Sequence, residues 1–217
     1  IKTGSISLNR AEALDSARIN NSAIASNNSW GPCDAVSGPN CTSAYTYNEL
    51  ATEAANNGRN IREQFAALNG GTTDAATYIT AMDNFQDSGV IVYANSNFSN
   101  DTDASYFAAL PFYFNGTTDS VDLSDAWISV MYAEFTGTSL SGASTSDFSR
   151  EGNPCGNAKE FCLVVDDTAI GAAGYVDSSG ASQYSVMGGS SMGAPQVSGM
   201  IALLSQAFPS HTPAQLT

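Results

Sequence analysis

The residues best suited to chemistry lie in one segment, Gly188 to Gly199, which reads GGSSMGAPQVSG. Its paired glycines allow a sharp backbone turn, and the apolar residues that follow predict a helix starting near Ser191. Free N–H groups and the helix dipole favour negative charge at such a start. A hydroxyl there suits acyl transfer, because an oxyanion can form against those amides. We place Pro195 in the first turn, where no helical N–H is needed. The alternative is that Ser191 is only a helix cap.

This segment resembles the nucleophile motif of the subtilisin-like serine proteases, Gly-Thr-Ser-Met-x-x-Pro. Gly189 to Pro195 matches it, with Ser190 in place of the threonine. The resemblance implies that Ser191 is the nucleophile of a protease that works through an acyl-enzyme. It also implies an α/β fold of three layers with a central, mostly parallel sheet. We expect residues 1–217 to form part of such a catalytic domain, incomplete at both ends.

Two further segments are similar to the same family. Asn27 to Gly31, NNSWG, resembles the strand that binds an extended peptide and walls the primary specificity pocket. Val92 to Asn97, VYANSN, resembles a strand that ends in Ala-Ala-Gly-Asn, so the resemblance makes Asn97 the side-chain donor to the oxyanion. Here larger polar residues replace Ala and Gly, and we expect them to narrow the pocket. The implied substrate-binding residues are Ser29, Trp30, Gly31, Tyr93, Ala94, Asn95 and Ser96.

The general base that should activate Ser191 is not found before it. The family places Asp first, His second and Ser last, whereas the only histidine is His211, about 20 residues after Ser191. At about 1.5 Å per helical residue, His211 lies roughly 25–30 Å away, beyond the ~3 Å that a general base can span. We expect an upstream segment of the same precursor to supply Asp and His, and residues 1–217 alone to be inactive.

The four cysteines form two pairs that are close in sequence, Cys33 with Cys41 and Cys155 with Cys162. Two short disulfide loops are expected, and they indicate an oxidising compartment. The alternative is four unrelated thiols.

A further resemblance is to the subtilases of bacterial autotransporters, which implies a secreted or bacterial cell-surface protein. It is carried by Ala108–Pro111, Trp127–Val130, Phe148-Ser149, Cys155-Gly156 and Cys162. The Ala-Pro-Gly that the family has after the second cysteine is absent, and Val165-Asp166-Asp167 stand in its place.

Charge and composition exclude several classes of function. Lys and Arg total 7 against 21 Asp and Glu, a formal charge of −14 that repels nucleic acids and anionic membranes. No apolar run approaches the roughly 20 residues of a membrane-spanning helix. One histidine and no Cys-x-x-Cys argue against zinc, and we expect Asp101 and Asp103 to be solvated in a polar loop. We therefore expect no metal and no cofactor, and a peptide or protein as the substrate.

Hydrophobic patterns predict the elements that position these residues. Alternating helices and buried strands are typical of a layered α/β fold. Thr73 is a plausible N-cap, and the last helix is apolar almost all round, which predicts burial in the domain centre. Residues 32–72 are polar and are expected to be a surface insertion. Helices are expected over 7–20, 47–68, 73–87 and 191–207, and strands over 23–31, 90–94, 126–133 and 162–165.

Two other readings stay open. Gly189-x-Ser191-x-Gly193 also fits the Gly-x-Ser-x-Gly turn of an α/β-hydrolase esterase, but that fold needs an acid and a His after the serine, and no Asp or Glu follows Ser191. A subtilase-like peptide-binding module that has lost its base would also explain the missing histidine, but the retention of both Ser191 and Asn97 favours a base supplied from outside this sequence.

Overall fold

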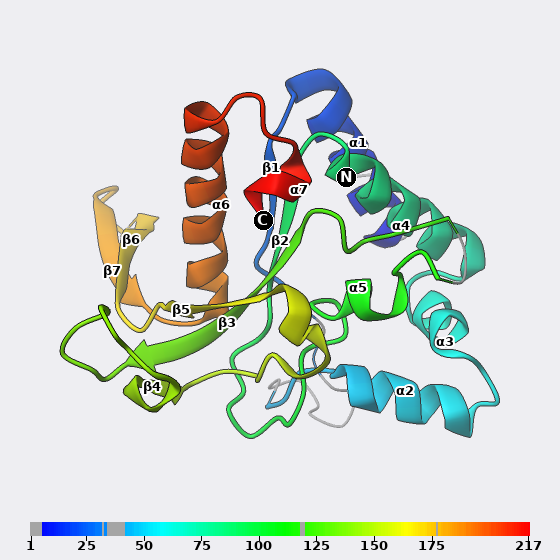
Figure 1. Cartoon of the computed structure of the whole chain (residues 1–217), viewed down its shortest axis with the longest axis horizontal. Helices are drawn as coiled ribbons and strands as arrows, with labels where there is room; N and C mark the ends of the chain where they lie inside the picture. The colour runs from blue at the N-terminus through cyan, green and yellow to red at the C-terminus, as the bar shows by residue number, and fades with distance from the viewer. Residues whose placement is uncertain (1–5, 32, 34–41, 118–119, 177) are drawn as a thin grey trace.

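The computed structural model describes residues 6–31, 33, 42–117, 120–176 and 178–217. This part of the chain has three layers, with a sheet between helices on its two sides (Figure 1). The prediction of an α/β fold with a mostly parallel central sheet is therefore confirmed.

The central sheet has five strands, which are β1 (Ala25–Asn28), β2 (Val90–Ala94), β3 (Trp127–Phe135), β4 (Phe148–Arg150) and β5 (Cys162–Asp166). β2 lies between β1 and β3 and is parallel to both. β3 also pairs with the parallel β5 and the antiparallel β4. All five residues of β2 are buried, as a continuous apolar run in a parallel sheet requires.

The strands predicted over 90–94, 126–133 and 162–165 are confirmed. The strand predicted within 23–31 is shorter and only half-buried. Among the described residues it pairs with β2 alone, so one of its edges has no neighbour to cover it. A separate antiparallel hairpin, β6 (Ile170–Val176) and β7 (Ser182–Met187), precedes the last long helix.

Alternating side chains of β2 pack into two different hydrophobic cores, because successive residues of a strand point to opposite faces of the sheet. Val90 and Val92 pack against α6 (Ser190–Ala207) through Val197 and Ile201. Tyr93 faces the opposite layer, where α1 (Ile6–Asn21) and α4 (Thr72–Gln86) complete the larger core.

The single helix predicted over 47–68 is two helices, α2 (Tyr47–Asn56) and α3 (Ile61–Leu68). Each helix begins with its own capping box, at Thr46 for α2 and at Asn60 for α3. The second box starts a new helix at Ile61 where a single continuous helix was predicted. Leu50 and Phe65 are fully buried in the larger core. The described part of segment 32–72 therefore contributes buried side chains from both helices to the larger core, and its being an insertion stays a prediction.

The other helices differ from prediction mainly at their ends. α1 confirms the helix expected over 7–20. α4 begins at Thr72 with Gly71 as its N-cap, so the assignment of that cap to Thr73 was wrong. The short helical turns are α5 (Leu110–Tyr113), η2 (Thr145–Asp147), η3 (Gly156–Phe161) and α7 (Pro213–Leu216).

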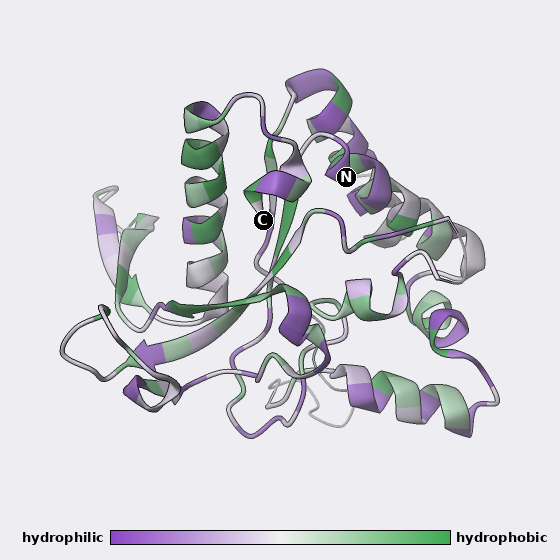
Figure 2. Ribbon diagram, in the orientation of Figure 1, coloured by the Kyte–Doolittle hydropathy of each residue, from purple (hydrophilic) through white to green (hydrophobic). Residues whose placement is uncertain are grey.

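The prediction that α6 is buried all round is wrong for the described chain. Hydrophobic residues follow the helix over much of its length (Figure 2). Only the side facing the sheet is covered, whereas Met200 and Leu204 are about half exposed, at 46% and 39%, and Leu203 is 67% exposed. No helix in the described ranges has the length and apolarity needed to cross a membrane.

Candidate active site

Three segments meet at the carboxyl edge of the parallel sheet. They are the residues after β1, the residues after β2 and the first turn of α6. Parallel strands end at the same edge, so this is where an open α/β sheet offers a binding crevice. The structure brings Ser29, Asn97 and Ser191 together here, from positions far apart in the sequence.

Ser29 and Ser191 bind each other in both directions. The Ser29 hydroxyl donates to the Ser191 carbonyl at 3.0 Å, and the Ser191 hydroxyl donates weakly to the Ser29 carbonyl at 3.4 Å. Ser191 is partly exposed. Its hydroxyl therefore lies at the surface beside the segment predicted to bind substrate.

Pro195 explains why the Ser191 carbonyl is available to Ser29. It lies inside α6 and not in the first turn, which corrects our prediction. Its ring nitrogen carries no hydrogen, so it cannot make the helical bond to the carbonyl four residues earlier, which belongs to Ser191. The Ser29 hydroxyl supplies the missing donor.

Asn97 is held by Ser190, the residue directly before the predicted nucleophile. Its Oδ1 accepts from the Ser190 amide at 2.7 Å and from the Ser190 hydroxyl at 2.8 Å. The same hydroxyl accepts from the Ser96 amide at 3.0 Å. Among the described residues Nδ2 of the exposed Asn97 has no partner, so this amide group is free to donate to another molecule.

Gly189 permits this close approach. A Cβ at this position would lie 2.8 Å from Nδ2 of Asn97, and the backbone φ is +128°, a conformation that side chains disfavour. Only glycine fits between the sheet edge and the Asn97 side chain without displacing it.

Trp30 is fixed by aromatic and cationic neighbours. Its ring packs edge-on against Tyr93 and Phe107, at centroid distances of 5.2 and 4.8 Å. The guanidinium of Arg10, from α1, lies 3.4 Å from the centroid of the Trp30 ring. Gly31, one residue later, is exposed with open space beside it. The Trp30 ring is thus held in place by its neighbours, and the backbone of Gly31 is accessible. The role of both residues in binding substrate stays a prediction.

The predicted substrate residues at the end of β2 are mostly buried. Tyr93 and Asn95 are 0% exposed and Ala94 is 5% exposed. The Asn95 side chain donates to the carbonyls of Asn153 and Pro154 and accepts from another backbone amide. Its amide is satisfied inside the protein, so the expectation that this side chain narrows a pocket was wrong. A backbone role in binding substrate stays a prediction.

Asp167 is a buried acid beneath the first turns of α6, and sequence reasoning did not single it out. It is 0% exposed, and among the described residues neither carboxylate oxygen makes a hydrogen bond of ordinary geometry; the backbone amides of Gly193 and of Asp167 itself lower its pKa only in part. Oδ2 lies 2.5 Å from where a Cβ on Gly193 would be. Burial raises the pKa of the Asp167 carboxyl to about 6. The replacement of Ala-Pro-Gly by Val165-Asp166-Asp167 was the only signal of it in the sequence.

The prediction that the two acids of the loop after Asn97 are solvated was wrong for Asp103, whereas Asp101 is partly exposed. Asp103 is 1% exposed and accepts from the Asn157 amide and side chain, both at 2.8 Å. Asp101 accepts from Ala44 and Asn153. No group of three or more His, Cys, Asp or Glu in the described ranges could hold a metal ion.

His211 follows the last residue of α6, whereas Ser191 lies in the first turn of that helix, and Figure 1 shows the length of α6 that separates its two ends. It is exposed in the turn before α7, with its ring against Phe208 at 5.0 Å. The expectation that His211 is not the base of Ser191 agrees with this position.

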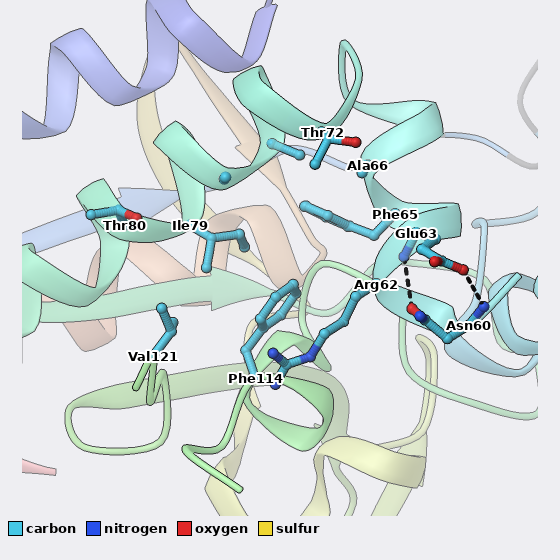
Figure 3. A pocket seen from close by; sticks show the side chains of 12 residues that line it. Asn60, Arg62, Glu63, Phe65, Ala66, Thr72, Ile79, Thr80, Phe114 and Val121 are labelled. Carbon is cyan, nitrogen blue, oxygen red and sulfur yellow. Dashed lines mark hydrogen bonds between the residues drawn. The ribbon is translucent and has the colours of Figure 1, made fainter. Parts of the chain in front are cut away.

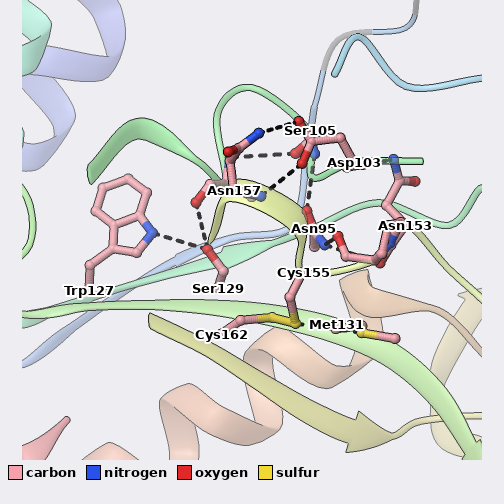
Figure 4. The surroundings of a disulfide bond; sticks show 12 residues. Asn95, Asp103, Ser105, Trp127, Ser129, Met131, Asn153, Cys155, Asn157 and Cys162 are labelled. Carbon is pink, nitrogen blue, oxygen red and sulfur yellow. Dashed lines mark hydrogen bonds between the residues drawn. A yellow bond between two sulfur atoms is a disulfide. The ribbon is translucent and has the colours of Figure 1, made fainter. Parts of the chain in front are cut away.

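The disulfide predicted between Cys155 and Cys162 is present, with a Cα–Cα distance of 5.9 Å (Figure 4). It ties the start of η3 to the start of β5. The second predicted pair involves Cys41, which lies outside the described residues, so the link from Cys33 to Cys41 stays a prediction.

A cavity of ≈ 400 Å³ lies elsewhere, between α3, α4 and the segment that contains Phe114 and Val121 (Figure 3). None of the predicted site residues lines it.

The fold and the site define a class of α/β protein in which a serine opens a helix at the carboxyl edge of a parallel sheet. Residues 3–217 match the model of the subtilase family, and the chain belongs to that family. No curated protein sequence matches the chain.

Several solved structures resemble the chain at low identity. The prenylagaramide maturation protease PagA has a TM-score of 0.47 and 16% identity, covering 99% of this chain and 56% of its own. A cold adapted subtilisin-like serine proteinase has a TM-score of 0.45 and 17% identity, and the match covers 95% of this chain and 50% of the proteinase. The serine protease MycP1 of the type VII (ESX-1) secretion system has a TM-score of 0.36 and 18% identity, and the match covers 85% of this chain and 54% of MycP1. The chain thus spans about half the length of each.

Proposed function

We propose that the complete protein is a serine endopeptidase in which Ser191 is the nucleophile. The observation that carries the proposal is the joint placement of Ser191 and Asn97: one hydroxyl and one unpaired amide group flank the start of α6. The helix start adds backbone N–H groups and a favourable dipole for a developing negative charge.

The reaction follows from these positions. The Ser191 Oγ bonds to the carbonyl carbon of the scissile peptide while its proton passes to an imidazole. The Asn97 side-chain amide and the Ser191 backbone amide stabilise the resulting oxyanion. The carbon–nitrogen bond then breaks, the amine leaves with the proton from the imidazole, and water hydrolyses the acyl-enzyme. Ser29, Trp30 and Gly31, with the backbone of 93–96, form the surface along which the peptide lies.

The imidazole and its aspartate partner come, in this proposal, from an upstream segment of the same precursor. Two features of the described chain support it. β1 pairs with β2 alone and so offers a free edge for another strand. The exposed side chains of Met200, Leu203 and Leu204 offer α6 a second apolar face, and such a face is stable when a further layer covers it.

We further propose that the protein is secreted or displayed on a bacterial surface, as an autotransporter-type subtilase. The Cys155–Cys162 disulfide supports an oxidising compartment. The high negative charge suits a soluble protein that acts on peptides.

A second candidate is a catalytically dead subtilase scaffold that binds peptides. The observation in its favour is that the chain has one histidine, which lies far from Ser191. The retained pairing of Asn97 with Ser190 favours the protease, because a binding module has no need of an unpaired amide group at the helix start. Membership of the subtilase family disfavours the α/β-hydrolase reading.

Labelling of the complete protein by a fluorophosphonate tests the proposal. We expect labelling of the wild type, none of Ser191→Ala, and full labelling of a control, Ser198→Ala. Ser198 lies on the same helix and is partly buried, but its hydroxyl donates to the Ala194 carbonyl of its own helix and not to Ser29 or Asn97. A folded, complete protein that is not labelled, or whose labelling survives Ser191→Ala, would leave the binding module as the better account.

A further inference from the structure

We propose that Asn153 is a positioning residue that holds the Ser96–Asn97–Phe98 segment in the conformation that oxyanion stabilisation needs. The inference rests on the proposed function, since it concerns the same predicted oxyanion donor. Asn153 lies in the connection between β4 and η3, more than fifty residues after Asn97, and it is 0% exposed.

The segment that carries Asn97 is strained. Ser96 has a φ of +109°, in a region that residues with a side chain rarely occupy. Such a conformation persists only where the surroundings enforce it, and it is common at active sites. The peptide around Asn97 therefore depends on external contacts to keep its geometry.

Asn153 supplies contacts on both sides of Asn97. Its backbone amide donates to the carbonyl of Ser96 at 3.3 Å, and its side-chain Oδ1 accepts from the amide of Phe98 at 3.1 Å. The residue before Asn97 and the residue after it are thus held by one partner. This leaves the Asn97 side chain as the part of the segment that can face a ligand.

The remaining polar groups of Asn153 bind the same stretch of chain (Figure 4). Nδ2 donates to the Asp101 carboxylate at 2.9 Å and to the Asp103 carbonyl at 3.0 Å. The Asn153 carbonyl accepts from the Asn95 side chain at 3.1 Å. Because the residue is buried and each group is used, its side-chain orientation is fixed.

Two neighbours keep Asn153 against the segment. A Cβ on Gly152 would lie 2.5 Å from the Ser96 carbonyl oxygen, so only glycine allows this approach. Two residues after Asn153, the disulfide from Cys155 to Cys162 anchors the connection to β5. The segment around Asn97 is thereby tied to the sheet by a second set of contacts, besides those that Ser190 makes with the Asn97 side chain.

The test compares Asn153→Ala with Asn157→Ala in the complete protein. Asn157 belongs to the same polar network, but its side chain bonds to Asp103 and Asn48 and not to residues 96–98. For Asn153→Ala we expect kcat to fall about 10- to 100-fold with KM changed less than threefold, since a displaced oxyanion donor mainly affects the transition state. For Asn157→Ala we expect less than a threefold change in either.

A double-mutant cycle separates positioning from a general loss of structure. If Asn153 acts through Asn97, the kcat loss from Asn153→Ala nearly disappears in an Asn97→Ala background. An equal loss in both backgrounds would overturn the proposal. Hydrogen exchange provides a readout that needs no activity: the Phe98 amide should exchange at least 10-fold faster in Asn153→Ala, whereas amides within β2 keep their protection.

These outcomes are distinct from failure of the proposed function. A protein that shows no Ser191-dependent hydrolysis would refute the protease proposal, and the Phe98 exchange would still decide whether Asn153 holds the segment. Unchanged exchange at Phe98 in Asn153→Ala would overturn the positioning role whatever the activity.

Discussion

Ser29 and Ser191, 162 residues apart in the chain, each donate a side-chain hydrogen bond to the other's backbone carbonyl. The reciprocal pair ties the end of β1 to the first turn of α6. It is made possible by Pro195, which removes the helical donor that would otherwise occupy the Ser191 carbonyl. The predicted nucleophile and the predicted peptide-binding strand therefore hold each other in position.

The first prediction concerns this pair. Ser29→Ala removes the side-chain donor that the described residues offer to the Ser191 carbonyl, and it leaves the helix start less fixed. We expect a loss of stability of about 1 kcal/mol, the usual net contribution of a hydrogen bond, and a fall in kcat/KM of roughly 5- to 10-fold. Urea denaturation and peptide hydrolysis measure the two effects. Ser29→Cys is a weaker donor of similar shape and should give an intermediate loss, and wild-type values for Ser29→Ala would contradict the coupling.

The second prediction concerns Asn97. Asn97→Ala removes the unpaired amide group beside Ser191, and we expect kcat to fall by about 10²–10³ with little change in KM. Ser190→Ala should cost less, because the Ser190 backbone amide would still hold Oδ1 of Asn97. Steady-state kinetics on a peptide substrate measure both. A change that falls mainly on KM would show that Asn97 binds substrate and does not stabilise the transition state.

The third prediction concerns the pH dependence of stability. Burial raises the pKa of Asp167 to about 6 from the ordinary 3.8, so the folded protein binds this proton more tightly than the unfolded chain. Its contribution to stability is therefore fully present below about pH 4 and is lost as the pH rises through 6. Asp167→Asn, which cannot ionise, should be more stable than the wild type by about 1–3 kcal/mol at pH 8 and equal to it near pH 4.

Urea unfolding of both proteins across this range provides the measurement for Asp167. The difference between variant and wild type isolates one group, because every other acid titrates in both. Asp166→Asn, at the exposed neighbouring position, is the comparison variant: it removes only the smaller repulsion that Asp166 exerts on Asp167 and should give a clearly smaller pH-dependent gain. A constant difference between Asp167→Asn and wild type from pH 4 to 8 would contradict the raised pKa.

Features with a local pattern were predictable from the sequence. The run VIVYA gave β2 because no polar residue interrupts it, and the segment from Gly189 to Pro195 indicated a helix that starts with a serine. Helix boundaries were less certain, since the split between α2 and α3 depends on the single capping residue Asn60.

Features that depend on partners far along the chain were not predictable. The bond that Pro195 leaves open is filled by a residue of β1, and nothing near Pro195 indicates it. Asn153 is one asparagine in a polar loop, and only its burial against residues 95–103 distinguishes it from a solvated turn residue. Asp103 was expected in solvent for the same reason, because its partner Asn157 is 54 residues away.

The last prediction concerns the disulfide between Cys155 and Cys162, which closes a loop of sequence separation 7. Replacing both cysteines by serine should lower stability by about 2–3 kcal/mol, the chain-entropy value for so short a loop. The bond also anchors the connection that carries Asn153, so kcat should fall more than KM rises. Adding a reductant to the wild type should lower both its stability and its kcat in the same way. The stability and kcat of the double serine variant should not change when the reductant is added. If the double serine variant loses stability but keeps the wild-type kcat, the loop would hold Asn97 in place without its covalent anchor, and the kinetic half of this prediction would fail.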